Sequence, residues 1–387
     1  MELARLFNGI QIKTHFAADF GSNATTERRD PASYELDLQL RVRVPKPHQD
    51  LPQLLQLNPD LPLALPALQS LVANAKVSPL FEELYQRKIA YLQSNFPKLE
   101  PLLSRHNFFD TETILELEHP ETHRKALLVQ ADMDVDTDGS DGDRVPTMEG
   151  LSSTFQPFTS YRWNKRGKAP NPFLASWEKR LKDIEKELSA TNIPPPRSKE
   201  LKETQAKLKQ EIADLKSKSF LVGSTDPFIV LPLPMLSRKS GAAAAQVGDF
   251  CVLIHGKRLF PAIVGDAGPT YQSGEASLRI CREISNRASA ANRPESELKV
   301  TYLVFPNTAI SPREQPNYEL WWSRCDALLQ ELGGYSGELF FFEDFTKPKP
   351  APGPEEPDFV GPKLPFLGPP APPTPSSVQS AGPRSNP

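Results

Sequence analysis

Alternating and continuous runs of apolar residues recur along the chain and predict β-strands. In residues 34–44, apolar side chains occupy every second position and polar side chains occupy the positions between them. This period of two is typical of a strand with one buried face. The runs at 113–117 and 125–130 predict two strands with a hairpin-like connection. Later runs predict strands at 228–231, 250–254, 259–264, 300–305 and 339–342.

Other segments space their apolar residues by three and four, which predicts helices. A serine and a proline at 78–79 resemble an N-cap and a first helical residue, so we expect a helix from there to about Asn95. A further helix is predicted at 318–332. Residues 171–218 contain two narrow apolar stripes separated by three prolines, at 194–196, and predict an antiparallel helical hairpin.

These elements predict an α+β protein with a mostly antiparallel, barrel-like sheet and flanking helices, because the strands are short and several are joined by hairpin-like turns. The helical hairpin should project from the sheet. Fourteen of the 41 prolines fall between Pro348 and Pro387, which predicts a disordered C-terminal tail. The expected organisation is an N-terminal strand and helical packing region, 1–110, a main domain, 111–346, with the hairpin inserted at 171–218, and the tail, 347–387.

The composition limits the classes of binding partner and the cellular compartment that we expect for this protein. The formal net charge is −3, so no broad positive field predicts nucleic-acid binding. No run of about 18 apolar residues predicts a membrane span. The three cysteines, Cys251, Cys281 and Cys325, follow no paired spacing and predict buried thiols rather than a disulfide framework. Residues 1–7 lack the long apolar core of a signal peptide, which predicts a cytoplasmic protein.

A run of aspartates follows the strand predicted at 125–130. The pattern from Asp134 to Gly139 resembles the first half of an EF-hand loop, in which alternating carboxylates surround a hard cation. Val145 occupies the position of the bidentate glutamate, so no strong Ca²⁺ site is predicted. Three interpretations stay open: a solvated acidic loop, a subsite for cations or ammonium groups, and a metal site. The run comprises Asp132, Asp134, Asp136, Asp138, Asp141 and Asp143.

Two further carboxylates lie where a strand is predicted to end and where the next helix is predicted to begin. Asp266 follows the apolar run 259–264, and Glu275 starts a segment with helical spacing. Both side chains are therefore expected to face a cleft. We expect the helix dipole to keep Glu275 ionised and burial to raise the pKa of Asp266.

The residues around these carboxylates resemble the glycoside hydrolase family 75 chitosanases. Asp266 is followed nine residues later by Glu275, as in the catalytic segment of that family. The resemblance covers roughly residues 115–306, without the helical stretch in its middle. In chain order, the matching segments are 132–139, 226–231, 265–277 and 300–306.

This resemblance implies an endo-acting enzyme that hydrolyses β-1,4 bonds in chitosan or glucosamine-rich oligosaccharides, with inversion. We expect no cofactor, and whether the Asp-rich run binds a metal stays open. It implies that Asp266 and Glu275, in the domain 111–346, are the catalytic carboxyl groups. The electrostatic expectations above make Glu275 the base and Asp266 the acid. Family members are typically secreted and tend to carry a cysteine in the Asp-rich run, where this chain has Thr137.

Other residues are expected to bind the polysaccharide. Carboxylates suit the ammonium groups of glucosamine, and aromatic rings and amides suit sugar faces and hydroxyls. The aromatic residues are equally well interpreted as core anchors. Alternative functions are a non-catalytic glycan-binding or interaction protein, with a protein partner at the hairpin or the Pro-rich tail, and a hydrolase of amino-sugar cell-wall glycan. The substrate-binding candidates are Asp134, Asp136, Asp138, Gln156, Tyr161 and Trp163.

Overall fold

The computed structural model describes residues 17–347, apart from residues 34, 36, 38, 40, 96–108, 149 and 237–243. The helices and strands described below all belong to the first of the two units into which the chain divides, Met1–Thr346. The predicted disordered tail from Pro348 onward lies outside the described residues, so its disorder stays a prediction.

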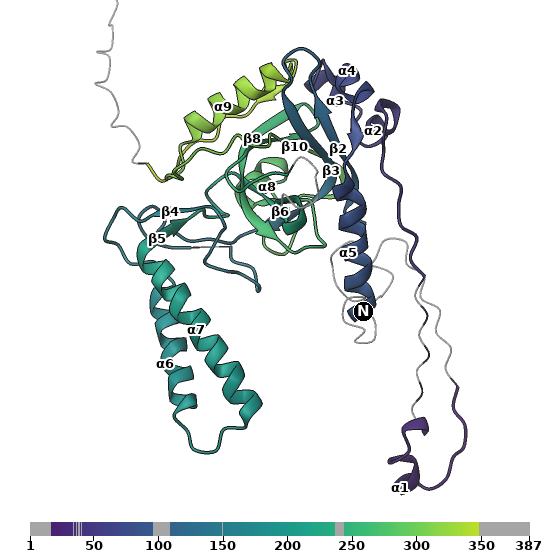
Figure 1. Ribbon diagram of the computed structural model, residues 1–387, viewed down its shortest axis with the longest axis vertical. Coiled ribbons are helices and arrows are strands. Elements are labelled where there is room, and N and C mark those ends of the chain that lie inside the picture. The colour runs from purple at the N-terminus through teal and green to yellow at the C-terminus, as the bar shows by residue number, and fades with distance from the viewer. Residues whose placement is uncertain are drawn as a thin grey trace, which may run out of the picture. The chain divides into compact units, whose positions relative to one another are not determined.

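A closed barrel of six strands forms the centre of the fold (Figure 1). In order around the ring, the strands are β3 (Lys125–Asp136), β10 (Glu295–Val304), β7 (Phe250–His255), β8 (Arg258–Gly268), β6 (Phe228–Pro232) and β9 (Glu275–Ser277). The ring closes because β9 pairs with β6 on one side and with β3 on the other. Only the pairs β3–β9 and β6–β8 within this ring are parallel. The predicted α+β fold with a mostly antiparallel, barrel-like sheet is confirmed.

Further elements cover the outside of the barrel. β2 (Thr111–Glu118) pairs antiparallel with β3, which confirms the predicted hairpin, and β1 (Lys76–Val77) pairs with β2. β11 (Glu338–Leu339) pairs in parallel with β8 and is shorter than the strand predicted at 339–342. The helix predicted near the C-terminus forms α9 (Tyr318–Glu331), which packs against β7 and β8.

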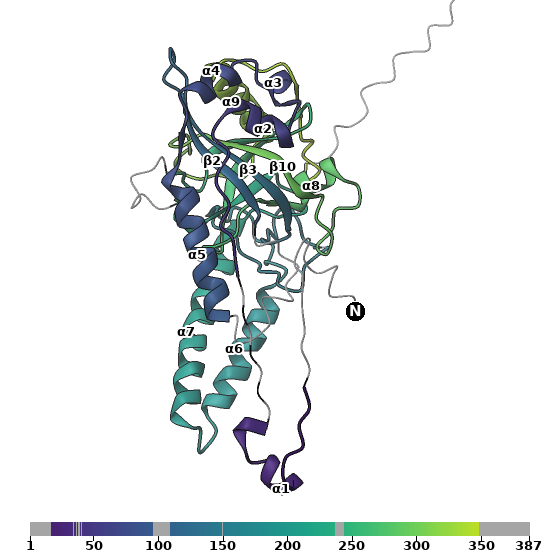
Figure 2. The ribbon, with the colours of Figure 1, turned by 90° about the vertical axis from the view of Figure 1, so that its right-hand side faces the viewer.

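Several helices precede or flank these strands. The helix predicted from residue 78 forms α5 (Pro79–Asn95), which packs against β2. Figure 2 shows α2, α3 and α4 grouped beside β2. The other described helices are α1 (Ala24–Glu27), η2 (Pro31–Ser33), α2 (Leu51–Leu57), α3 (Leu61–Ala64), α4 (Leu68–Ala73), η5 (Leu233–Leu236) and α8 (Leu278–Ile284), of which η2 and η5 are 3-10 helices.

The strand predicted at 34–44 is not formed by the residues described there. Residues 41–44 belong to no strand, and Val44 is 49% exposed. An alternating pattern buries one face only where another element covers it, and no described strand pairs with residues 41–44. Outside the described residues lie Tyr34, Leu36, Leu38 and Leu40.

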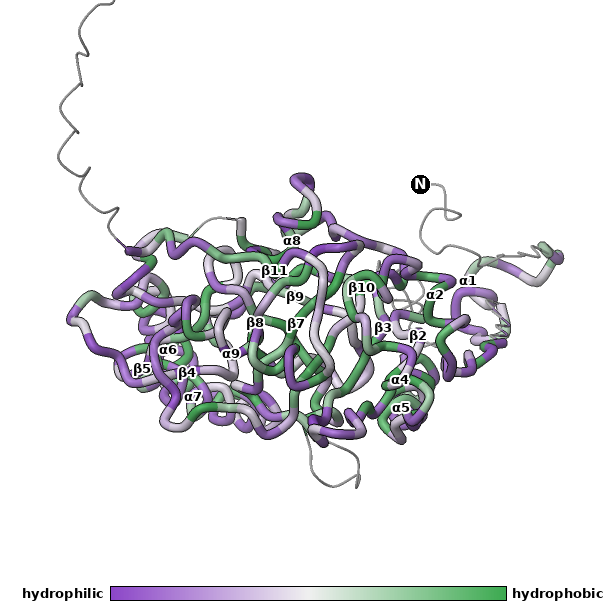
Figure 3. Tube along the Cα trace, turned by 90° about the horizontal axis from the view of Figure 1, so that it is seen from above, coloured by the Kyte–Doolittle hydropathy of each residue, from purple (hydrophilic) through white to green (hydrophobic). Residues whose placement is uncertain are grey.

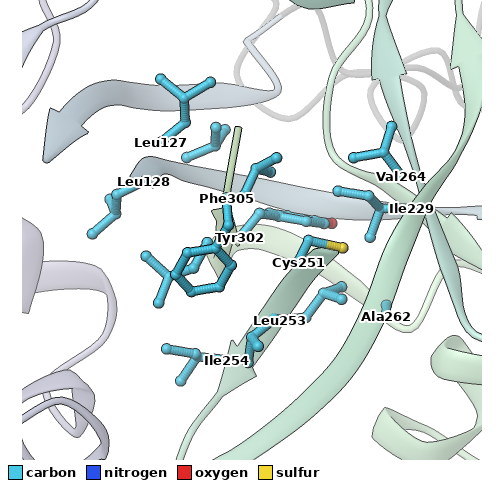
Figure 4. Close-up of a cluster of buried hydrophobic side chains, with 14 of the residues drawn as sticks. Leu127, Leu128, Ile229, Cys251, Leu253, Ile254, Ala262, Val264, Tyr302 and Phe305 are labelled. Atoms are coloured by element: carbon cyan, nitrogen blue, oxygen red, sulfur yellow. The ribbon is translucent and has the colours of Figure 1, made fainter. Parts of the chain in front are cut away.

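One hydrophobic core joins the barrel strands and the helices that cover them. Figure 4 shows side chains of this core from β3, β6, β7, β8 and β10, among them Leu128, Ile229 and Tyr302. Figure 3 shows hydrophobic residues concentrated along the central strands and hydrophilic residues along the outer segments. All three cysteines are free and buried, as predicted. Removal of this apolar surface from water is the main stabilising contribution to the barrel.

The predicted helical hairpin is present. α6 (Leu174–Leu188) and α7 (Pro195–Ser217) pack against each other, and β4 (Arg162–Asn164) pairs with β5 (Lys218–Phe220) at their base. Figure 1 shows the two helices extending together from this pair of strands, and Figure 2 shows α6 and α7 from a second direction. The apolar stripe of α7 is buried, with Leu208 only 2% exposed. The stripe therefore stabilises the hairpin itself.

Candidate active site

Strand register brings Asp266 and Glu275 to the same face of the barrel wall. Val230 of β6 is the register partner of Asp266 in β8 and also of Glu275 in β9. Glu275 is in turn the register partner of Asp134 in β3. Register partners on adjacent strands point to the same face of a sheet. Asp266, Val230, Glu275 and Asp134 therefore form one row across four strands, which we call the carboxylate row.

A β-bulge at Gly265 decides the face on which Asp266 lies. The register between β6 and β8 shifts by one residue just before Val230, so Gly265 has no register partner. Without this shift, Asp266 would point to the opposite face, because the side-chain period of a strand is two. Glycine is needed at the bulge, since a Cβ atom at Gly265 would lie 2.6 Å from the Cβ of Phe228.

Glu275 lies in a strand, which corrects the prediction that it begins a helix. β9 starts at Glu275, and α8 starts only at Leu278. The segment with helical spacing becomes helical only after residues 275–277. These three residues form strand β9, which pairs with β3 and β6. Gly274, with a φ of 74°, makes the turn into this strand, and its carbonyl accepts the N–H of Asp134 at 2.7 Å. The helix-dipole argument therefore does not apply to Glu275.

One oxygen of the Asp266 carboxyl group is held by three hydrogen bonds. Its Oδ1 accepts the Oγ–H of Ser160 at 2.6 Å, the N–H of Ser160 at 2.9 Å and the N–H of Ala267 at 2.7 Å. Burial raises the pKa of Asp266 above its ordinary value, as we expected, while these hydrogen bonds favour the ionised form and act in the opposite direction.

Among the described residues, no hydrogen bond of this kind supports the charge of Glu275. Burial, the largest cause, raises the pKa of Glu275 to about 8, and the negative charges of Asp134, Asp266 and Asp138 add to the rise. The expectation that Glu275 is held ionised was therefore wrong. At neutral pH its carboxyl group is mostly protonated and can donate a proton.

Asp136 and Asp138 extend the acidic surface beyond the carboxylate row. Asp136 accepts the N–H of Asp138 at 2.6 Å, and Asp138 accepts the N–H of Gln156 at 2.9 Å. Burial raises the pKa of Asp138 to about 7. Burial and then the charge of Glu275 raise the pKa of Asp136 well above its ordinary value. A cationic ligand beside these groups would relieve this repulsion.

The other aspartates of the run bind neighbouring side chains. Arg293 donates from Nη1 to Asp132 at 2.7 Å and lies with Nη2 2.8 Å from an oxygen of Asp134. Arg144 donates to Asp141 at 2.6 Å. Because Asp132, Asp136 and Asp141 are buried, the interpretation of the run as a solvated loop is wrong. β3 itself continues to Asp136 and carries half of the run.

A groove of about 1160 Å³ opens beside the carboxylate row. Glu275 lines it together with Asp134, Asp136 and Asp138. Its other walls come from three loops, which contribute residues at 151–154, 269–272 and 289–293. Asp266 is separated from Glu275 by one strand and is not among the lining residues.

The segment that contains this arrangement matches a known family. The family model described as fungal chitosanase of glycosyl hydrolase group 75 matches residues 133–323. The chain belongs to this family. No curated protein matches the chain. The part that matches the fungal chitosanases contains the whole carboxylate row, whereas α5 and the elements before it lie outside the match.

The remaining substrate-binding candidates of this chitosanase-family chain are Gln156, Tyr161 and Trp163, and they lie in different environments. Gln156 is exposed and follows the loop that lines the groove. Tyr161 and Trp163 are only 8% and 5% exposed, and their rings pack 6.1 Å apart. Tyr161 also donates from its hydroxyl group to the carbonyl of Glu314. These two side chains fit the interpretation as core anchors, because a buried ring offers no face to a sugar.

Sequence reasoning missed several residues of the site. Ser160, which binds Asp266, lies among the aromatic residues that drew attention instead. Arg293 lies in a polar loop far along the chain, and nothing in its local sequence points to Asp132 or Asp134. Tyr271, which lines the groove, stands four residues before Glu275. Its position close to the segment that resembles the family was the one sequence signal that could have indicated it.

The acidic run is not arranged as an EF-hand. Asp134 contacts Arg293, and Asp136 and Asp138 accept backbone N–H groups. Within the part of the chain that the structure describes, no group of three or more His, Cys, Asp or Glu side chains is placed to hold a metal ion. Among the described helices, none combines the length and the apolar character that crossing a membrane requires.

Proposed function

We propose that this chain hydrolyses β-1,4 bonds within chitosan or glucosamine-rich oligosaccharides, with Asp266 and Glu275 as its catalytic carboxyl groups. Glycoside hydrolysis needs one carboxylic acid to protonate the leaving oxygen and one carboxylate to activate water or attack the sugar. The observation that carries the proposal is the shared register partner Val230, which puts both carboxyl groups on one face of the wall.

Their strand positions are compatible with inversion of the anomeric carbon, which the family resemblance implies. Adjacent strands lie about 4.8 Å apart, so the Cα atoms of Asp266 and Glu275, with one strand between them, are expected roughly 9–10 Å apart. Inverting glycosidases hold their carboxyl groups about 6.5–9.5 Å apart, which leaves room for a water molecule. Retaining enzymes need a much shorter distance, about 5–5.5 Å.

We assign Glu275 as the general acid and Asp266 as the general base, the reverse of the sequence-based assignment. Glu275, with its raised pKa, holds the proton that the leaving oxygen needs. Asp266, whose ionised form accepts hydrogen bonds from Ser160 and Ala267, removes a proton from the attacking water. The water oxygen bonds to the anomeric carbon as the glycosidic bond breaks, and proton exchange with solvent resets both groups.

The acidic wall of the groove supports a glucosamine substrate. Asp136 and Asp138 present carboxyl groups whose ionisation is opposed by burial, so protonated amines would bind them and favour their charged forms. Asp134 is expected to contribute less, because Arg293 and Gln272 already bind its two oxygens.

The test is to incubate the purified protein with chitosan and, separately, with peptidoglycan, and to measure new reducing ends. Chitosan should be cleaved, and NMR of the first products should show the inverted anomer. Asp266→Asn and Glu275→Gln should each lower the rate by about a hundredfold or more while the fold is kept, since positioned proton transfer contributes typically 10²–10⁴-fold. Cleavage of peptidoglycan alone would favour the cell-wall alternative, and binding without cleavage would favour a glycan-binding protein.

A further inference from the structure

Helix α5 reaches the groove, although it precedes the segment that matches the chitosanases. The ring of Tyr91, near the end of α5, stacks on the ring of Tyr271 with centroids 3.8 Å apart and planes inclined by 15°. Tyr271 lies in the loop that leads into β9 and lines the groove. A helix expected only to pack therefore supports a residue of the groove wall.

A second contact ties the same loop to α5. Lys88 of α5 forms a buried ion pair with Asp110, with Nζ and Oδ2 2.5 Å apart. The same Oδ2 atom accepts the N–H of Ser273 at 3.1 Å, two residues after Tyr271. Both charged side chains are at most 5% exposed, so this link is shielded from solvent and salt. The loop is thus held at two points, one on each side of Gln272.

The chemistry of Tyr271 differs from that of its neighbours in the groove. Of the described residues that line the groove, Tyr271 alone carries an aromatic ring. The ring is half-buried, with Tyr91 stacked against one face, so the surface left to the groove belongs to its other face and edge. The flat face of a pyranose ring packs on such a surface, and an ammonium group is attracted to the face of a tyrosine within about 6 Å.

We propose that Tyr271, supported by Tyr91 of α5, forms an aromatic subsite that binds a glucosamine ring in the groove. The proposal rests on the proposed function, because it assumes a glucosamine oligomer in this groove. The subsite would combine a ring face for the sugar with the carboxyl groups that line the same groove, which suit its ammonium groups. Binding at this subsite would depend on α5, because Tyr91 supports Tyr271. The N-terminal region of the chain would therefore contribute to substrate affinity.

The test is calorimetric binding of glucosamine hexamer to variants made in the Glu275→Gln background, where cleavage does not interfere. Tyr271→Ala should weaken binding about tenfold or more, a magnitude typical of a lost cation–π and stacking contact. Tyr271→Phe should keep the affinity, since it keeps the ring. Tyr91→Ala should weaken binding less than Tyr271→Ala, and Tyr91→Phe should restore it. Tyr335→Ala removes a half-buried tyrosine outside the groove and should change nothing.

Kinetics of the same substitutions in the active protein separate a subsite from a general structural role. A subsite predicts a raised KM for the hexamer with a small change in kcat, and a smaller effect on the acetylated hexamer, which carries no charge. If the Glu275→Gln parent binds the hexamer and Tyr271→Ala in that background binds it equally well, the subsite proposal is wrong. The proposed function is then unaffected. Absence of binding and cleavage in the unsubstituted protein would overturn both.

Discussion

At the scale of single residues, Gly265 determines the orientation of a carboxyl group that the proposed reaction needs. The bulge at Gly265 turns Asp266 to the face that carries Glu275. Burial raises the pKa of both carboxyl groups, but their surroundings differ. Hydrogen bonds from Ser160 and Ala267 oppose the rise at Asp266, whereas neighbouring negative charges add to it at Glu275. A pair of carboxyl groups in unequal surroundings is the arrangement that acid–base catalysis needs.

Gly265→Ala should damage the site as well as the fold. The added Cβ would meet Phe228 and the side chain of Leu221 at 2.6–2.7 Å, so we expect a loss of roughly 1–3 kcal/mol in the free energy of unfolding. The rate of hydrolysis should fall by more than the fraction of unfolded protein accounts for. A change at the bulge would also shift Asp266, the next residue. Gly256→Ala is the control: its φ of 58° predicts a comparable strain, but its Cβ would lie in open space and leave the carboxylate row unchanged.

Ser160→Ala should show which carboxyl group is the base. It removes the hydroxyl group that donates to ionised Asp266 at 2.6 Å, so the pKa of Asp266 should rise further. In the pH profile of kcat/KM, the acidic limb should then move to higher pH, while the alkaline limb near pH 8 stays in place. Movement of the alkaline limb instead would contradict the assignment of Glu275 as the acid.

Glu275→Gln should stabilise the protein at alkaline pH. Since the pKa of Glu275 rises from 4.5 to about 8 in the folded state, folding loses stability as pH increases through this window. Below pH 4.5 the carboxyl group is protonated in both states and costs nothing. The melting temperature of Glu275→Gln relative to the parent should therefore rise more at pH 9 than at pH 4. Glu338→Gln, at an exposed glutamate, should show no such difference between the two pH values.

At the scale of elements, a buried ion network holds the acidic loop to the barrel. Arg144 binds both oxygens of Asp226, at 2.8 and 2.9 Å, and donates to Asp141. Tyr318 of α9 donates to Asp226 at 2.6 Å. The network therefore connects the loop after β3, the segment before β6 and α9, and it fixes the path of the chain just beyond Asp138.

Arg144→Ala should cost about 3–5 kcal/mol in the free energy of unfolding, because it leaves Asp226 buried without its cation. Arg162→Ala breaks an exposed ion pair with Asp214 and should cost about 0–1 kcal/mol. Urea unfolding of both variants measures the difference. Equal, small losses would mean that the Arg144 network contributes little to the fold.

At the scale of the whole molecule, the barrel carries additions with different roles. α5 contacts the groove loop and belongs to the proposed subsite. The α6–α7 hairpin packs its apolar stripe internally, and none of its described residues lines the groove. A protein partner at the hairpin stays a prediction.

Shortening the hairpin should leave hydrolysis unchanged. Replacing residues 182–210 with a short Gly/Ser linker keeps the contacts of the base, including the hydrogen bond from Trp177 to Glu211. The rate on glucosamine hexamer should match that of the full chain. A marked drop, with an unchanged melting temperature, would show that the hairpin acts on the substrate.

The sequence by itself determined the local properties of this protein. Apolar periodicity was sufficient to predict most barrel strands, α5, α9 and the helical hairpin. Each of these elements follows from the spacing of apolar side chains within its own segment. The order of four short motifs, together with the spacing of Asp266 and Glu275, was sufficient to indicate the family. The same reasoning failed at 34–44, where no covering element supports the alternation, and at Glu275, where pairing with β3 and β6 outweighs the helical spacing that follows.

Only the tertiary structure decided how the carboxyl groups differ. Their pKa values depend on burial and on charges brought close by strand pairing between segments more than a hundred residues apart, and local sequence carries no record of these distances. The same holds for Arg293 beside Asp132 and for Tyr91 beneath Tyr271. The two candidate carboxyl groups could be identified from the chain, whereas the burial and neighbouring charges that shift their pKa values are set by the closed barrel.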